Sequence, residues 1–446
     1  MAAVSRALDR FEVTFDDETL VADAGLIVPA TLMVRLGLER LVNHTVRLRG
    51  RVGGALPGRK VLTLIAAILV GGTHIDHADR LRAGATQRVL PFRVMAPSTL
   101  GTFLRSFTFG HIRQLDAVIG ETIRRAWSLG AGPAHSAMTI DVDSTICAVH
   151  GKAKQGAAYG YTKTLGYHPL VATRAGTGEV LHARLRKGSA NTQRGVKRFA
   201  EELVARVRRA GATGALTLRA DAGFYNWELI ATLSRLGVAW SITVNMNPSI
   251  RRAIAAIDET DWTDISYPDG GTAQVAETTY VTGGGATKRA RRHVRLVVRR
   301  TRLTDPTQAQ LWPDWRHHAF VTNIEAPTIE ADQFHRDHAT VELAIRDLKE
   351  GAGLEHCPSG RFFANAAWLA CAVLAHNMIR WTARLGDTHP DDQLTVARTI
   401  RTRLITVPGR LVNRSRRWTL RLPARWPWAT TFHTALDQIR SLPQMT

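Results

Sequence analysis

The sequence has few cysteines and no hydrophobic run long enough to cross a membrane. Its three cysteines, Cys147, Cys357 and Cys371, lie far apart and form no CxxC pair, which argues against a disulfide framework or a structural zinc site. The two most apolar runs, Val61–Val70 and Ala366–Ala375, are about half of the ~20 residues that a membrane span requires, so we expect core helices there. The first residues are polar and show no signal-peptide pattern. We therefore expect a cytoplasmic protein that does not bind membranes.

Acidic residues are also scarce in comparison with basic ones. The 446 residues include 38 Asp and Glu against 59 Lys and Arg, which gives a net charge of +21. Such a surface attracts polyanions and releases counterions when it neutralises phosphates. A ribosomal protein, or an arginine preference of the genome, would give a similar balance. Because 45% of residues are apolar and 22% are charged, the chain is expected to fold into two or three ordinary globular domains.

The first part of the chain, residues 1–133, has helical patterning and is strongly basic. Leu26–Val42 and Leu115–Trp127 carry apolar residues at helical spacing, and Gly130-Ala131-Gly132-Pro133 is a plausible hinge. Two of these helices could form a helix-turn-helix, although no base-reading signature is visible. We expect a helical, basic DNA-binding region.

The following segments have the pattern of an α/β protein. Residues 134–245 contain strand patterns and then a strand–helix–strand unit, which predicts a mixed sheet covered by helices. Residues 246–316 are rich in Thr and Tyr and include the basic patch 288–292, so we interpret them as a β-rich insertion. Residues 317–386 return to the core with a strand and two helices, the first over Thr328–Glu350. Residues 387–446 form a basic, arginine-rich tail.

Acidic residues stand at three places where this pattern would bring them to one cleft. Asp141 and Asp143 lie at the end of the first strand of the core, two residues apart and therefore on the same face. Asp221 comes directly after another buried strand, where side chains converge in open α/β sheets. Glu342 lies within the helix over 328–350. Each acid alone has a structural alternative, as a turn or cap residue or as a solvated ion pair.

Basic groups flank Glu342 on its helix. His335, His338, Arg346 and Lys349 share one stripe with it, at spacings of 3, 4, 4 and 3 residues. Two or three converging carboxylates are sufficient for Mg²⁺, and two such ions can clamp a scissile phosphate. The flanking groups would then hold the DNA backbone.

In this order and spacing the motifs are similar to those of the DDE transposases of bacterial insertion sequences, and most closely to the insertion sequence thirteen-eighty family. The segments that carry the resemblance are Asp141-Val142-Asp143-Ser144-Thr145, Tyr159-Gly160-Tyr161, Gly166-Tyr167-His168-Pro169-Leu170, Arg184-Leu185-Arg186-Lys187-Gly188 and Leu218-Arg219-Ala220-Asp221-Ala222-Gly223-Phe224. The similarity is strongest over residues 137–245 and 318–385. It implies an RNase H-like catalytic core with a mixed sheet.

The resemblance also implies a role for each site residue. The metal-binding and catalytic acids would be Asp143, Asp221 and Glu342, with Asp141 in a supporting role. The family signature Tyr-x2-Arg-x3-Glu-x6-Lys stands here as His335-x2-His338-x3-Glu342-x6-Lys349, so both the Tyr and the Arg are replaced by His. His335, His338, Arg346 and Lys349 would contact DNA. Glu350 is the alternative acid if Glu342 does not face the cleft.

The implied activity is cut-and-paste transposition with two Mg²⁺ ions, which Mn²⁺ could replace. The partners would be the terminal inverted repeats and a target duplex, bound by a homodimer in the bacterial nucleoid. A tryptophan of the insertion, Trp262, Trp312 or Trp315, could stabilise a flipped base. Two alternatives remain open at this point: an RNase H-like nuclease that does not transpose, and a DNA-binding protein derived from an inactive transposase.

Overall fold

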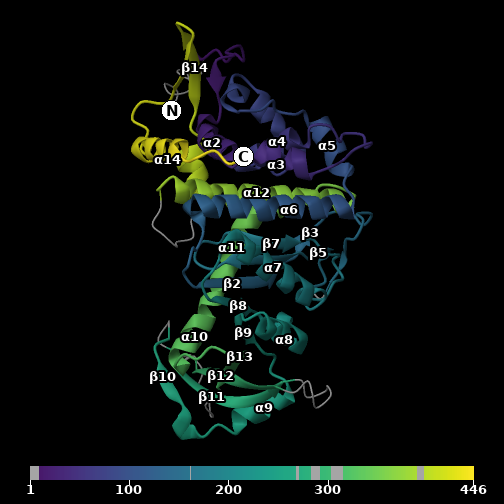
Figure 1. The fold of residues 1–446 in the computed structure, drawn as a ribbon, viewed down its shortest axis with the longest axis vertical. Coiled ribbons are helices and arrows are strands. Elements are labelled where there is room, and N and C mark those ends of the chain that lie inside the picture. Colours follow the sequence, from purple (N-terminus) through teal and green to yellow (C-terminus); the bar gives the residue numbers. More distant parts are fainter. Residues whose placement is uncertain (1–9, 161, 268–270, 283–291, 303–314, 389–395) are drawn as a thin grey trace.

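The computed structural model describes residues 10–160, 162–267, 271–282, 292–302, 315–388 and 396–446. Figure 1 shows an elongated molecule in which the two chain ends lie together among helices at one end of the long axis. The core strands of the main sheet occupy the middle, and the strands of the insertion lie at the opposite end. The basic patch 288–291, Trp312 and Tyr161 lie outside the described residues.

The N-terminal region is helical. Its elements are η1 (Ala24–Leu26), α2 (Ile27–Arg35), α3 (Leu38–Thr45), α4 (Pro57–Leu69), η2 (Ile75–Arg82), η3 (Thr86–Val89), α5 (Pro97–Arg105), α6 (Phe109–Ala126) and the π-helical turn η4 (Trp127–Ala131). The helical pattern over Leu26–Val42 belongs to two helices, because Gly37 adopts a φ of 61° between α2 and α3. Every residue of α4 except Arg59 is buried.

The main sheet has nine strands and mixed direction. Its core strands are β2 (Met138–Ser144), β6 (Leu170–Arg174), β7 (Val180–Arg184), β8 (Leu216–Ala220) and β9 (Ala239–Thr243). They run in the order β7-β6-β2-β8-β9, with β6 antiparallel to both of its neighbours and with β8 parallel to β2 and β9. A small sheet of β3 (Cys147–Ala148), β4 (Ala158–Tyr159) and β5 (Leu165–Tyr167) follows β2. This arrangement is the mixed α/β sheet that the sequence predicts.

The residues from 246 to 322 extend the same sheet. They form α9 (Pro248–Ala255), η6 (Glu259–Asp261), β10 (Thr263–Ile265), β11 (Thr272–Thr282), β12 (Arg292–Arg302) and β13 (Arg316–Thr322). β13 pairs antiparallel with β9, and β12, β11 and β10 follow in antiparallel order. The expected β structure is therefore continuous with the core and is not a separate sheet.

Helices cover the sheet and connect it to the N-terminal region. α7 (Val196–Ala210), η5 (Ala222–Phe224) and α8 (Trp227–Arg235) follow β7 and β8 in the chain. The amphipathic α7 buries Val196, Phe199, Leu203 and Val207, and Gly211 ends it with a φ of 114°. The helix expected over 328–350 is a continuous helical ribbon of α10 (Thr328–Arg336), η9 (Asp337–Ala339), α11 (Thr340–Arg346) and η10 (Asp347–Gly351).

The longest helix, α12 (Phe362–Leu385), lies between the N-terminal helices and the sheet (Figure 1). Among the described residues it is the one helix that is long and apolar enough to cross a membrane, but 89% of its most apolar window is buried inside the protein. Its polar residues bind the β6–β7 turn: Asn377 pairs with both backbone groups of Val180, and His376 bonds the carbonyl of Gly178. We therefore interpret α12 as a core helix.

The C-terminal residues fold back onto the N-terminal region. They form α13 (Ala397–Ile400), η11 (Arg401–Ile405), β14 (Gly409–Arg414), β15 (Arg417–Arg421) and α14 (Ala429–Ser441). β14 pairs with β1 (Leu20–Val21) in a three-stranded sheet, and α14 packs on α2. The segment expected as a basic tail is thus structurally joined to the first helices.

Candidate active site

The strand register brings Asp143 and Asp221 side by side. β2 and β8 are parallel neighbours in which Asp141 lies beside Arg219 and Val142 lies beside Ala220. The next step of this register places Asp143 beside Asp221, and side chains at alternate positions of paired strands point to the same face. Asp143 accepts a hydrogen bond from the amide of Ser144 at 2.6 Å, and Asp221 caps η5 by accepting from the amide of Gly223 at 3.1 Å.

Burial disfavours the ionised forms of both carboxylates. Burial raises the pKa of Asp143 to about 6, and the charges of Asp221 and Glu342 raise it as well, against the lowering effect of the Ser144 amide and His338. Burial also raises the pKa of Asp221, again against the lowering effect of His338. Because burial and two neighbouring acids disfavour the ionised form of Asp143, a bound cation would stabilise that form.

Glu342 reaches this site from the helix that crosses the sheet. α11 packs against β2 and β6, with Val341, Ala344 and Ile345 buried beneath it. Glu342 itself is exposed, yet its charge acts on Asp143. Glu350, which is also exposed, is not among the groups whose charge acts on Asp143.

Asp141 is fully engaged in a buried ion pair. It is 1% exposed, and Arg219 donates to both of its oxygens at 2.8 and 3.0 Å. His338 contacts the same carboxylate, with Nδ1 2.8 Å from Oδ1. Arg219 also donates to the carbonyl of Phe334 and lies 4.8 Å from the centre of its ring. Asp141 and Arg219 thus fasten β2 and β8 to the helix that carries Glu342, a positioning role.

Arg219 is a functional residue that the sequence pattern alone did not reveal. A signal was available, because Arg219 stands two residues before Asp221 and so shares its strand face. His168 was quoted only as part of a motif, and it also supports the site. Its buried ring contacts the Ser144 hydroxyl through Nε2 at 2.9 Å and the Ala190 carbonyl through Nδ1 at 2.7 Å.

The two histidines of the expected DNA-binding stripe differ in position. His338 lies beside Asp141 and its charge acts on both Asp143 and Asp221. His335 is 4% exposed, with its ring nitrogens 2.7 Å from the Ser241 hydroxyl and 2.9 Å from the Thr243 hydroxyl.

The ring of His335 also stacks on Phe320 at 4.0 Å, and burial lowers the pKa of His335 to about 2. The position does not support the expected DNA contact of His335. Both ring nitrogens are engaged inside the protein and the ring is neutral, so the side chain offers nothing to a phosphate. Arg346, in contrast, is exposed and Lys349 is half-buried on the following turns of the helix.

The donor set fits magnesium. Asp143, Asp221 and Glu342 offer hard carboxylate oxygens, which Mg²⁺ prefers. Within the described ranges, no three His, Cys, Asp or Glu side chains surround one point closely enough to hold an ion alone. Mg²⁺ usually takes one or two carboxylates and completes its shell with water and substrate phosphates, so a complete protein cage is not required.

Two of the expected tryptophans share a pocket on the insertion. Trp262 and Trp315 lie on the Arg300 guanidinium, which is 4.1 Å from one ring centre and 4.6 Å from the other. They line a pocket of about 600 Å³ together with His317. Arg300 also donates to both oxygens of Glu259. Trp312, the third candidate, is outside the part of the chain that the structure describes.

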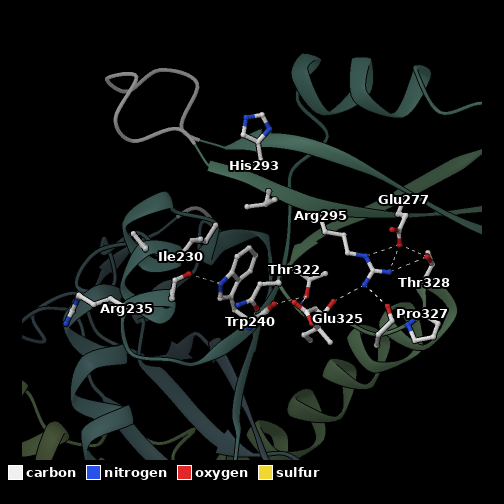
Figure 2. A pocket seen from close by; sticks show the side chains of 16 residues that line it. Ile230, Arg235, Trp240, Glu277, His293, Arg295, Thr322, Glu325, Pro327 and Thr328 are labelled. Atoms are coloured by element: carbon white, nitrogen blue, oxygen red, sulfur yellow. Dashed lines mark hydrogen bonds and ion pairs between the residues drawn. The ribbon is translucent and has the colours of Figure 1, made fainter.

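A larger hollow of about 960 Å³ lies between α8 and the strands of the insertion (Figure 2). Figure 2 shows Arg295 at its wall, held by Glu277 at 2.9 Å and by the carbonyls of Ile324 and Ala326 at 2.8 and 2.6 Å. This arginine connects β12 to the segment before α10. None of the predicted catalytic acids lines the hollow, so we assign its polar groups a structural role.

Comparison with known proteins identifies the family. The family model described as "Transposase DDE domain group 1" matches residues 6–444. The chain belongs to this family. The match covers nearly the whole chain, so the protein is a DDE-family transposase, and both the helical region and the sheet fall within the family model.

Among solved structures the transposase is similar to the piggyBac transposase in a synaptic complex with hairpin DNA. The two share 13% identity with a TM-score of 0.44, over 86% of this chain and 79% of that one. A comparison with curated proteins finds none that matches.

Proposed function

We propose that this transposase binds the terminal inverted repeats of an insertion sequence, cuts the DNA there and joins the released ends to a target duplex. The observation that carries the proposal is that Asp143 lies at the end of β2 and Asp221 directly follows its parallel neighbour β8, with the charges of Asp221 and Glu342 both acting on Asp143. In this proposal, Asp143, Asp221 and Glu342 are the catalytic and metal-binding acids.

Each side chain of the site has a defined task in this proposal. Asp143, Asp221 and Glu342 would hold two Mg²⁺ ions, or Mn²⁺ in their place. Bound ions of this kind activate the attacking water or 3′-hydroxyl and stabilise the leaving oxygen. Asp141 and Arg219 keep β2, β8 and the catalytic helix in register, so that the acids stay aligned.

The DNA contacts of the site would come from His338, Arg346 and Lys349. His338 is fixed by Asp141 on the side of the paired aspartates, while Arg346 is exposed further along the same helix. A charged group near the scissile phosphate offsets the negative charge that develops during phosphoryl transfer. His335 is left out of this set because both of its nitrogens face Ser241 and Thr243.

We further propose an RNase H-like core in the five strands β7-β6-β2-β8-β9. The support is their order, with two antiparallel pairs on one side of β2 and two parallel pairs on the other. Assignment to the insertion sequence thirteen-eighty branch rests on the quoted sequence segments. We also propose a homodimer on DNA, because two element ends must be held together. Its location would be the bacterial nucleoid.

Strand transfer separates this proposal from a nuclease that does not transpose. Purified protein is incubated with Mg²⁺, a duplex that carries the inverted repeats flanking the gene, and a target plasmid. We expect cleavage at the repeat boundary and covalent insertion of the end into the plasmid. Cleavage without insertion would favour the nuclease, and binding without cleavage would favour an inactive transposase derivative.

A further inference from the structure

The C-terminal hairpin projects from the end of the molecule where the chain termini lie (Figure 1). It consists of β14 and β15, joined directly by Ser415 and Arg416. These two residues have φ values of 50° and 63°. Two successive positive φ values are typical of the tight turn that matches the twist of a two-stranded ribbon. The hairpin is therefore a regular ribbon and not an irregular tail.

The two faces of the ribbon differ in character. Residues directly opposite in an antiparallel pair share a face, so the register places Leu411, Leu420 and Trp418 together on one side. The base of this side faces the protein, because Leu411 and Leu420 belong to or pack against the core. Nearer the turn, Trp418 is 53% exposed, and the Arg88 guanidinium lies 5.6 Å from the centre of its ring. The other side carries exposed arginines, namely Arg410, Arg414, Arg417 and Arg421.

The arginines on this second face lie directly opposite one another. Arg410 pairs across the ribbon with Arg421, and Arg414 pairs with Arg417. Like charges in such cross-strand pairs destabilise a sheet. Arg410 has a counterion in Asp17 at 3.0 Å, but no acidic side chain of the described residues forms an ion pair with Arg414, Arg417 or Arg421.

The neighbouring residues in the sequence supply no acidic side chains to balance these charges either. Residues 396–436 contain nine arginines and no aspartate or glutamate. Arg414, Arg417 and Arg421, which have no ion-pair partner in the described part of the chain, are complementary to a polyanion with regularly spaced charges. The alternation is specific, because a shift of one residue in either strand would bury the arginines and expose the leucines.

We propose that the arginine face of the β14–β15 hairpin is a second DNA-binding site, which grips the phosphate backbone of a duplex away from the catalytic acids. Guanidinium groups bind phosphates through paired hydrogen bonds. This inference rests on the proposed function, since it takes double-stranded DNA as the partner. It adds a site outside the catalytic domain that serves binding rather than chemistry.

The test measures how DNA binding depends on salt. The Arg414→Gln/Arg417→Gln variant removes one opposed pair from the face, and we expect the slope of log K against log salt concentration to fall by about 1.8, since each lost phosphate contact removes about 0.9. Phosphates are common to all duplexes, so the loss should be equal on repeat and unrelated DNA. The Arg414→Lys/Arg417→Lys variant should keep the slope.

A matched control neutralises two exposed arginines elsewhere, Arg209→Gln/Arg252→Gln on α7 and α9, and should change the slope less. Thermal unfolding of each variant reports whether it is folded. At saturating protein, the hairpin variant should cleave the repeat end at the wild-type rate, because no catalytic acid is changed.

An unchanged slope in the hairpin variant, or an equal loss in the control, would overturn the inference and leave the proposed function intact. Binding of the wild type to anionic phospholipid vesicles as tightly as to DNA, with the same loss in the variant, would also overturn it in favour of a membrane surface. Failure of the wild type to bind any duplex would instead refute the proposed function itself.

Discussion

Replacing Asp143 should make the metal-free protein more stable at neutral pH while it removes the activity. A carboxyl group whose pKa is higher in the folded protein than in the unfolded chain binds its proton more tightly when folded. Asp143 therefore favours folding when it is protonated, and that contribution is lost as the pH rises from about 4 to about 6. An uncharged asparagine side chain at this position has no such loss.

The size of the effect follows from the pKa of Asp143. Its rise from 3.8 to about 6 is about two units, and at ~1.4 kcal/mol per unit the metal-free wild type loses ~3 kcal/mol above pH 7. Asp143→Asn should therefore gain up to about 3 kcal/mol at pH 7.5 and almost nothing at pH 4. Asp141→Asn should have the opposite sign, about 3–5 kcal/mol of destabilisation, because it leaves Arg219 buried with a weakened partner.

Thermal unfolding in the presence of a chelator tests this pair, with wild type and both variants measured from pH 4 to pH 8. Adding Mg²⁺ should then stabilise the wild type more than Asp143→Asn, since an ion that binds only the folded state raises its stability. If Asp143→Asn is destabilised at pH 7.5 as much as Asp141→Asn, Asp143 is a structural residue and the reasoning is refuted.

Three further results are expected. Mg²⁺ affinity measured by calorimetry should fall as the pH drops below about 6, because Asp143 must lose its proton to bind the ion; a pH-independent affinity would contradict this. His335→Ala should cost about 2–5 kcal/mol of stability, since it removes a buried ring packed on Phe320. The folded fraction should bind DNA normally, and a selective loss of DNA affinity would restore the expected contact role of His335. Asp221→Asn should bind repeat DNA with wild-type affinity, and a large loss would mean that Asp221 serves folding instead of chemistry.

The sequence predicts the strands of the core and their end-of-strand acids well, because both depend on local rules. Alternation of apolar residues marks β2 and β8, and the parity of Asp141 and Asp143 puts both on one face. Parity does not decide which of these two carboxylates is free to bind a metal ion. That depends on Arg219, whose partner is set by the pairing of two strands 78 residues apart in the chain.

Longer-range arrangements are where the sequence is least informative. The helical stripe through His335 and Glu342 assumes one straight α-helix, but the ribbon tightens at η9 and widens at η10. As a result His335 faces β9 and β13, whereas Glu342 is exposed. The core strand expected after residue 316 is present as β13, but nothing local marks its pairing with β9 or the pairing of β1 with β14, because both partners are distant in sequence.

The most direct test of the account is a single-turnover cleavage assay on repeat-end DNA with Mg²⁺, at protein concentrations that saturate binding. Asp143→Asn, Asp221→Asn and Glu342→Gln should each lose at least about 100-fold in rate, the scale of losing one group that stabilises the transition state. Glu350→Gln, on the same helix, should cleave normally. Normal cleavage by Asp221→Asn, or loss in Glu350→Gln with Glu342→Gln active, would contradict the assignment of the catalytic acids.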